Sequence, residues 1–254
     1  MTVKVDIKAL LEAGVHFGHK TSRWHPKMAP YIHSKRQESH IIDLTKTVEG
    51  LDKALPFLTK VAASGKKVLF VATKKQAKDI VRAKAESINQ PFVVERWVGG
   101  MLTNQDTVSR QIRKLKDLEK RMAAGDLDNR YNKLEVQRFQ EEIDELNKKY
   151  GGIKDLGSDL GAVIVIDTIA DVNAIREART LGVPVVGVVD TNANPDMVDY
   201  VIPGNDDALK GIELLLDYFG QAVAEGAGSA QKADSAKKAE KAEKSETKEA
   251  KKED

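Results

Sequence analysis

Three apolar runs bounded by turn residues constrain the fold of this chain more than any other feature. They are VLFVAT at 68–73, AVIVID at 162–167 and VPVVGVVD at 183–190. Unbroken runs of this length are typical of strands buried on both faces of a parallel sheet. Amphipathic helical patterns follow the first two runs, at 74–88 and 171–181. This alternation predicts an α/β fold, a doubly wound parallel sheet of the Rossmann or flavodoxin-like type.

Shorter elements extend the same pattern. A short amphipathic helix opens the chain, with Leu10 and Leu11 on its apolar side and Gly14 at its end. Short strands are expected at 41–44, 92–94 and 200–202, and further helices at 45–63 and 206–224.

An insertion departs from that rhythm. Its second half repeats apolar residues at spacings of 3, 4, 3 and 4, which is typical of a coiled-coil seam, and its first half offers a facing arm. The run AAGDLDNRYN between the two halves predicts a turn. We interpret the insertion as an antiparallel coiled-coil helical hairpin, with arms about 27 Å long at about 1.5 Å per residue. The seam residues are Val108, Ile112, Leu115, Leu118 and Met122 in the first arm and Val136, Phe139, Ile143, Leu146 and Tyr150 in the second.

The chain accordingly divides into four parts. A basic segment, 1–40, precedes a sheet domain made of 41–103 and 151–225, which the hairpin at 104–150 interrupts. The tail at 226–254 carries eight lysines against seven acidic residues and almost no core-forming side chain. Such a composition predicts a tail that is disordered in isolation. A transient single helix is the alternative, since Ala, Lys and Glu favour helix.

Composition also indicates the compartment. The chain has no cysteine, which excludes disulfides and thiolate metal sites and fits a reducing cytosol. No apolar run approaches the roughly 18 residues of a membrane span, and the first residues lack the apolar core of a signal peptide. We therefore expect a soluble, cytoplasmic protein with no membrane partner.

The basic segment holds seven Lys or Arg residues against three acidic ones, and all five histidines of the chain. Its prolines and glycines predict a largely irregular conformation that a polyanionic partner would order. His16 and His19 form an H-x-x-H pair near Gly18, but two ligands do not make a zinc site. Hydrogen-bonded or RNA-contacting histidines are the preferred interpretation, and we expect no metal or cofactor.

An enzyme is the first alternative, since doubly wound sheets bind ligands at the carboxyl ends of their strands. However, no G-x-G-x-x-G, G-x-x-x-x-G-K-[ST] or G-x-S-x-G motif is present. Turn and helix-capping roles are favoured for the polar residues at those strand ends, so catalysis is poorly supported. The residues concerned are Asp167, Thr168, Asp171, Asp190, Thr191, Asn192, Asn194 and Asp196.

Nucleic-acid binding gathers more independent signals. Cations cluster in the basic segment, at the end of one strand and around the hinge sequence RWVGGMLTN. Lys and Arg would contact phosphates, and Trp24 or Trp97 could stack on a base, although packing is the commoner role of a Trp over a tight turn. The candidates for RNA binding over a broad surface are Lys20, Arg23, Trp24, His25, Lys27, Arg36, Lys74, Lys75, Arg96, Trp97, Asn104, Arg110 and Arg113.

Three long blocks carry a family resemblance. LLEAGVHFGHKTSRWHPKMAPYI, RWVGGMLTN and LGVPVVGVVDTNANPDMVDYVIPGNDDA resemble the bacterial family of small-subunit ribosomal protein two. The similarity runs in the same order across about residues 3–224, insertion included, and only the tail falls outside it.

The resemblance implies a structural, non-catalytic protein of the small ribosomal subunit. It implies a place between head and body, bound to small-subunit ribosomal RNA, with neighbouring ribosomal proteins including protein one as partners, and no homo-oligomer. Two alternative functions remain open. One is a free-standing enzyme acting on sugar phosphates or nucleotides, and the other is an adaptor whose hairpin binds another coiled coil.

Overall fold

The computed structural model describes residues 4–157 and 159–249, with side chains described in these ranges except at 128 and 231–249. Its centre is a parallel five-stranded sheet in the order β5-β4-β6-β7-β8. This is the flavodoxin-like order, in which the direction of winding reverses between β4 and β6. The predicted doubly wound sheet is therefore confirmed. The strands are β4 (Lys67–Val71), β5 (Phe92–Val93), β6 (Leu160–Val165), β7 (Val185–Val189) and β8 (Tyr200–Pro203).

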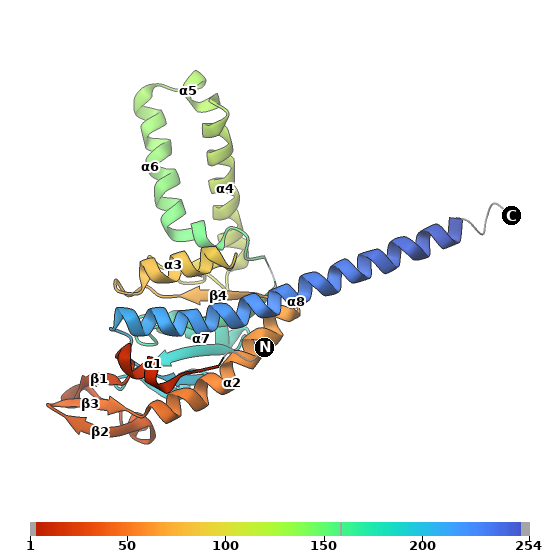
Figure 1. The fold of residues 1–254 in the computed structure, drawn as a ribbon. Helices are drawn as coiled ribbons and strands as arrows, with labels where there is room; N and C mark the ends of the chain where they lie inside the picture. Colours follow the sequence, from red (N-terminus) through yellow and green to blue (C-terminus); the bar gives the residue numbers. More distant parts are fainter. Residues whose placement is uncertain (1–3, 158, 250–254) are drawn as a thin grey trace.

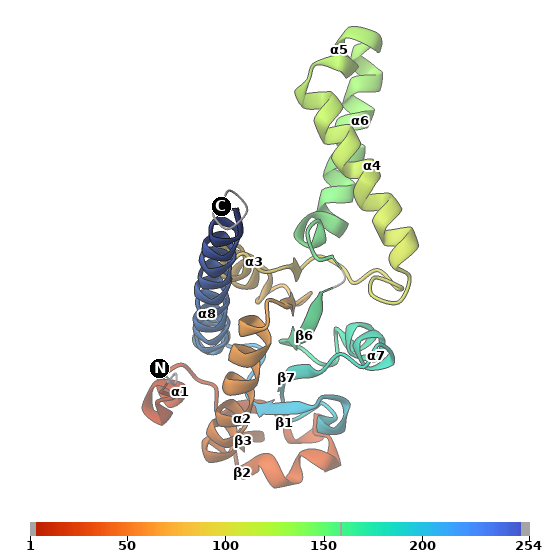
Figure 2. The ribbon, with the colours of Figure 1, turned by 90° about the vertical axis from the view of Figure 1, so that its right-hand side faces the viewer.

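Helices cover both faces of this sheet. Figure 2 shows α8 and α7 on opposite sides of the strands. Because side chains alternate along a strand, Phe70 of β4 packs with the helices of the first face, and Leu69 and Val71 pack on the second. The helices of the first face are α2 (Leu44–Ala63), α3 (Lys78–Ser87) and α8 (Leu209–Glu249), and α7 (Val172–Thr180) covers the second.

The insertion projects from the domain as a helical hairpin (Figure 1). It consists of α4 (Gln105–Ala123), a short α5 (Asp126–Arg130) and α6 (Lys133–Tyr150). The expected turn contains α5 because Leu127 is fully buried there. Leu115 and Ile143 of the predicted seam are buried between the arms, so the antiparallel hairpin is present. Coiled-coil packing of the arms stays a prediction.

The basic segment is not irregular, which corrects the expectation from its prolines and glycines. After α1 (Ile7–Glu12) it forms a second, antiparallel sheet in the order β1-β3-β2. In α1 only Leu10 of the expected apolar side is buried, whereas Leu11 is exposed. The elements that follow are β1 (Phe17–Lys20), the 3₁₀ turns η1 (Thr21–Arg23) and η2 (Pro26–Tyr31), β2 (Ile32–Arg36) and β3 (Ser39–Ile42).

Contacts with the loop after β7 hold this segment in place. The backbone N–H of His25 donates to the carbonyl of Thr191 at 2.7 Å, and the N–H of His19 donates to the Thr191 hydroxyl at 2.9 Å. The backbone comes so close that a Cβ on Gly18 would lie 2.5 Å from Cγ2 of Thr191. The chain itself therefore orders the segment, through partners far away in sequence.

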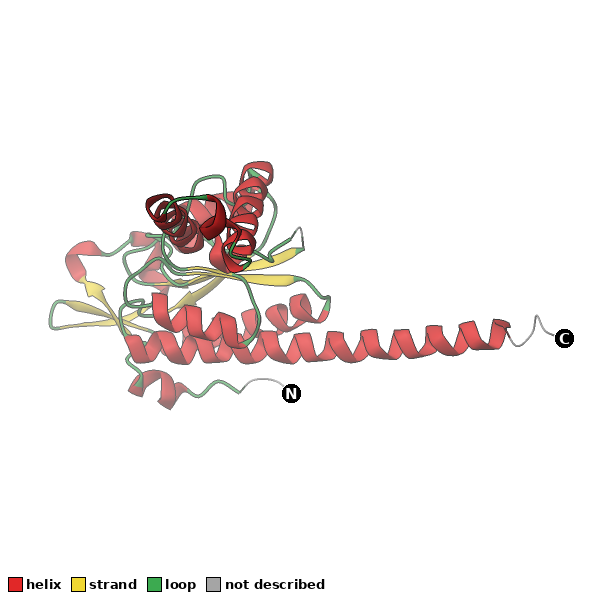
Figure 3. Ribbon diagram, turned by 90° about the horizontal axis from the view of Figure 1, so that it is seen from above, coloured by secondary structure: helices red, strands yellow, loops and turns green. Residues whose placement is uncertain are grey.

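The tail also differs from its expectation. Instead of becoming disordered at 226, the chain continues α8 as a helix to Glu249 (Figure 3). Ala, Lys and Glu are strong helix formers, which accounts for the continuation. Residues 250–254 lie outside the described part of the chain. Among the described residues, no helix is both long and apolar enough to cross a membrane.

A single carboxylate anchors the hinge at the root of the hairpin. Oε1 of Glu177, on α7, accepts hydrogen bonds from Nε1 of Trp97 at 2.9 Å and from the N–H of Gly100 at 2.8 Å. Its Oε2 accepts from the N–H of Leu102 at 2.9 Å and of Thr103 at 3.3 Å. Burial alone would raise the pKa of Glu177, but these donors outweigh it and the pKa lies below its ordinary value.

Replacing Glu177 by Gln should lower the free energy of unfolding by about 1–3 kcal/mol, because the amide cannot accept from four donors and carries N–H groups of its own. The depressed pKa means that the carboxylate stabilises the fold above about pH 4.3, and this contribution is lost as the pH falls through the folded-state pKa. Urea unfolding should therefore show a wild-type advantage at pH 7 that shrinks in acid.

Glu145→Gln is the matched control, since that exposed carboxylate forms its ion pair with Lys149 on its own helix and accepts from no backbone N–H among the described residues. Equal stability of Glu177→Gln and Glu145→Gln at pH 7 would contradict the anchoring role of Glu177.

Gly18→Ala should destabilise the chain by about 1–3 kcal/mol, because the new methyl would overlap the Thr191 side chain. Gly99→Ala is the control, since nothing lies within 4 Å of a Cβ built there. Urea denaturation of the two variants measures the difference. A Gly18→Ala protein as stable as Gly99→Ala would show that the segment does not pack this closely.

Candidate nucleic-acid interface

The carboxyl ends of the parallel strands, where a doubly wound sheet normally binds ligands, are filled by an internal ion-pair network. Nζ of Lys74 lies 2.7 Å from Oδ1 of Asp206, 2.6 Å from Oδ1 of Asp207 and 3.8 Å from Oδ2 of Asp167. Burial would lower the pKa of Lys74, but Asp206 and Asp207 outweigh it and raise the pKa. Lys74 is therefore held by carboxylates of the chain itself, and its expected role as a phosphate ligand stays a prediction.

His19 joins the same network from the second sheet. Its Nδ1 lies 3.1 Å from Oδ2 of Asp190, and its Nε2 lies 3.5 Å from Oδ2 of Asp207. The hydrogen bond to Asp190 raises the pKa of His19. Burial and the neighbouring Asp190 and Asp167 raise the pKa of Asp206 to about 7. The crevice is thus occupied by opposite charges of the chain itself, with more carboxylates than cations.

Part of this network has the donor set of a cation site. His19, Asp206 and Asp207 offer ligand atoms that lie within 4.8 Å of one another, and imidazole and carboxylate groups are suitable ligands for zinc. His16, the other weak candidate, does not belong to this group. Any bound cation would compete with the ammonium of Lys74 for the same carboxylates.

Asp167 and Asn194 at the strand ends perform turn and capping roles, as expected, whereas Oγ1 of Thr168 and Oδ1 of Asn192 are buried with no hydrogen-bond partner among the described residues. Asp167 accepts from the N–H groups of Ile169 and Ala170 at 2.9 Å each. Asn194 accepts from the N–H of Asp196 at 3.1 Å, at the start of η4 (Pro195–Met197). Asp171 accepts from the backbone and hydroxyl of Thr73, and burial raises its pKa to about 6.

Four further residues predicted to bind RNA have structural partners. Trp97 is only 8% exposed and donates to Glu177, so its ring packs and is not available for stacking. The side chain of Asn104 caps α4 by accepting from the N–H of Thr107 at 3.3 Å. His25 caps η2, and Lys27 forms an ion pair with Asp196.

Seven predicted cations remain exposed and have no acidic partner within ion-pair distance among the described residues. The guanidinium groups of Arg110 and Arg113 donate only within their own helix, to the carbonyls of Asp106 and Ser109 and to the Thr107 hydroxyl. The full set is Lys20, Arg23, Arg36, Lys75, Arg96, Arg110 and Arg113. Trp24 is 38% exposed, with its ring centroid 5.5 Å from that of His40. This set keeps its capacity to contact phosphates.

Six of the exposed cations lie in two separate regions, and the seventh, Lys75, follows β4 at the carboxyl edge of the sheet. Lys20 and Arg23 border the same cavity of about 680 Å³ beside the second sheet. Arg110 and Arg113 lie on α4, at the opposite end of the molecule, as Figure 1 shows for the elements. The structure therefore divides the expected broad surface into a second-sheet region and a hairpin-root region.

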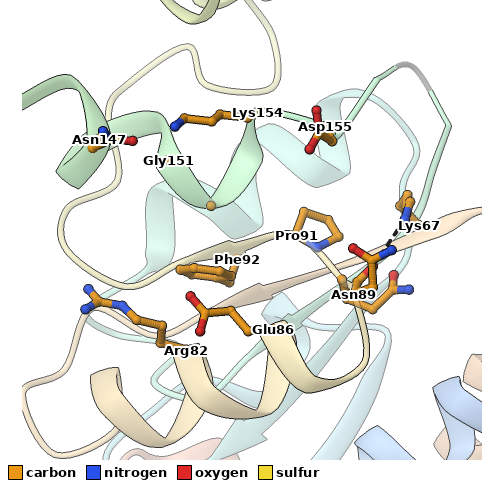
Figure 4. A pocket seen from close by; sticks show the side chains of 12 residues that line it. Lys67, Arg82, Glu86, Asn89, Pro91, Phe92, Asn147, Gly151, Lys154 and Asp155 are labelled. Carbon is orange, nitrogen blue, oxygen red and sulfur yellow. Dashed lines mark hydrogen bonds between the residues drawn. The ribbon is translucent and has the colours of Figure 1, made fainter. Parts of the chain in front are cut away.

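A polar pocket of about 520 Å³ opens between α3 and the turn η3 (Gly151–Ile153) below the hairpin (Figure 4). Arg82 and Glu86 line it from α3, and Lys154 lies above them. Lys67 and Phe92, which start β4 and β5, also line it. The pocket is therefore at the amino ends of the strands, away from the edge where doubly wound sheets bind nucleotides.

The sequence analysis did not single out Glu177, Asp206 or Asp207 for any of these roles. No local motif marks Glu177, since it is one acidic residue on an amphipathic helix. The adjacent acidic pair in GNDDA could have been recognised as a group at a strand end, but only the fold brings Lys74 and His19 to it.

Known proteins match nearly the whole folded part of the chain. The family model described as ribosomal protein S2 matches residues 10–226. The small ribosomal subunit protein uS2 of Roseiflexus sp. (strain RS-1) is 46% identical over 222 residues, covering 87% of this chain and 84% of that protein. The protein of the same name from Chloroflexus aggregans (strain MD-66 / DSM 9485) is 47% identical, covering 87% and 93%. The chain therefore belongs to the ribosomal protein S2 family of the small ribosomal subunit.

Proposed function

We propose that this protein is a structural, non-catalytic constituent of cytoplasmic ribosomes. It binds small-subunit ribosomal RNA between the head and the body and supports the docking of neighbouring ribosomal proteins, including protein one. It acts as a single copy in each particle, with no cofactor.

The observation that carries this proposal is the distribution of charge. At the carboxyl ends of the strands, Lys74 is neutralised internally by Asp206 and Asp207. In contrast, exposed cations without acidic partners lie on the second sheet and at the hairpin root. Uncompensated Lys and Arg on an exposed surface favour a polyanion, because counterion release drives binding to phosphates.

An enzyme with this fold would normally bind its substrate at the carboxyl ends of the strands, and in this chain that place is filled by side chains. A substrate in the crevice between β4 and β6 would displace the Lys74 network, and the nearby polar side chains of Asp167 and Asp171 are engaged as turn and backbone acceptors. The sequence has no glycine-rich phosphate loop at this edge.

Two charge-removal variants test the RNA surface. Replacing Lys20, Arg23 and Arg36 together by Gln, or Arg96 and Arg110 together by Gln, should weaken association with small subunits that lack this protein. Each lost phosphate contact should also reduce the slope of log K against log salt concentration by about 0.7–0.9. Co-sedimentation over a range of salt concentrations measures both effects.

The control replaces Lys46, Arg130 and Lys149 by Gln, because these exposed cations already have acidic partners on their own helices. Equal losses in the control and in the two variants would show that net charge, and not these surfaces, governs association. Unchanged association of both variants would refute the proposed RNA surface.

Trp24 offers a direct optical test, because the chain has only two tryptophans and Trp97 is buried. Small-subunit ribosomal RNA should quench the emission of Trp24 by stacking a base on its exposed ring. The quenching should disappear in Trp24→Phe, whose emission comes from Trp97 alone. Equal quenching in wild type and Trp24→Phe would contradict a stacking role for Trp24.

A further inference from the structure

An apolar groove of about 700 Å³ lies at the root of the hairpin, on a different side of α4 from Arg110. One wall is the first half of α4, with Val108 and Ile112. The other wall comes from the segment before β6 and the loop before β7, with Leu156, Leu160 and Leu181. The groove therefore joins the hairpin to the sheet domain.

The lining has a distinctive composition. Among the described residues that line it, the apolar side chains are all aliphatic or Met, and none is aromatic or acidic. Leu181, at the end of α7, is 45% exposed. A large apolar opening rimmed by polar residues is typical of a binding site on a folded protein.

Three cations border the groove, and two of them are already neutralised. Lys116 contacts Asp155 at 2.9 Å, and Lys154 contacts Glu119 at 2.7 Å. Arg113 donates through Nε to the carbonyl of Ser109 at 3.2 Å and has no acidic partner among the described residues. The groove thus presents one uncompensated positive charge beside an aliphatic surface.

This chemistry favours a protein segment over RNA as the occupant. Proteins hold unpaired bases by stacking them on aromatic rings or guanidinium planes, and the groove has no ring to offer. Aliphatic grooves receive the apolar face of an amphipathic helix, whose anchors recur at i, i+3, i+4 and i+7. A carboxylate beside that face would complement Arg113.

We propose that this groove docks a short amphipathic segment of a neighbouring protein, which inserts aliphatic side chains and pairs a carboxylate with Arg113. The inference rests on the proposed role in docking neighbours, and it adds the surface and the chemistry of the partner. Arg113 then acts as a protein contact, separate from the RNA-binding cations.

The first test uses the full-length protein and a labelled synthetic helical peptide with leucines at i, i+3 and i+7 and one glutamate beside them. Fluorescence anisotropy should show saturable binding, which Leu181→Asp and Arg113→Glu each weaken by about tenfold or more. A peptide with lysine in place of the glutamate should bind Arg113→Glu better than the original peptide does.

Arg110→Glu is the matched control, because it makes the same charge change on the same helix outside the groove. Leu134→Asp controls for the apolar substitution at an exposed site on the hairpin. Both controls should bind like wild type. Absence of saturable binding, or an equal loss in Arg110→Glu and Arg113→Glu, would overturn the proposal.

The second test places the photo-crosslinker p-benzoylphenylalanine at Ser109, an exposed residue of the groove wall, in purified small subunits. Mass spectrometry should identify a crosslinked protein segment with aliphatic residues at helical spacing and an adjacent acidic residue. Crosslinks to nucleotides alone, or to no partner, would overturn the groove proposal. Failure of the chain to enter small subunits would instead refute the proposed function.

Discussion

The position of the hairpin depends on one carboxylate that belongs to a different part of the chain. Glu177 lies on α7, yet it accepts hydrogen bonds from the indole of Trp97 and from the backbone of Gly100, Leu102 and Thr103. A loop rich in glycine has many conformations, and ordering it costs conformational entropy. Four donors converging on one charged acceptor offset that cost, because hydrogen bonds to an ionised group are the strong ones. The same loop leads into α4, so this interaction also sets the direction of the arm that carries the groove.

A second constraint acts at the carboxyl edge of the sheet. Five parallel strands bring Asp167, Asp190 and Asp206 together, and like charges this close to one another cannot remain uncompensated in a buried site. Lys74 from the sheet domain and His19 from the second sheet place positively charged or hydrogen-bonding groups beside these carboxylates. This network of side chains connects the basic segment to the sheet domain. It also fills the place where other doubly wound proteins bind a nucleotide. The exposed cations that have no acidic partner among the described residues lie on the outer surface, where a polyanion can contact them.

The periodicity of the sequence was sufficient to predict the main strands and helices of the sheet domain, the hairpin and the fold class. The runs at 68–73, 162–167 and 183–190 coincide with most of β4, β6 and β7, because unbroken aliphatic runs bury both faces of a sheet. The 3, 4, 3, 4 spacing in 136–150 predicted the hairpin. The prediction failed for the basic segment, where prolines and glycines suggested an irregular conformation, whereas the segment forms a sheet and Gly18 permits a close contact with Thr191. The packing favoured for Trp97 agrees with its burial. The ion pairs of Lys74 carry no signal in the sequence, because residue type shows capacity for a contact and not whether the side chain is already engaged.

The sequence by itself therefore determined the strand and helix order of the sheet domain, the insertion and the family, since these follow from local periodicity and from long matching blocks. Only the tertiary structure decided which cations are free, which tryptophan is exposed and where an aliphatic groove opens. The physical reason is that each of these depends on contacts between residues far apart in the chain, such as Glu177 with Trp97 or Lys74 with Asp206. Neither partner of such a pair carries a local signal of the other.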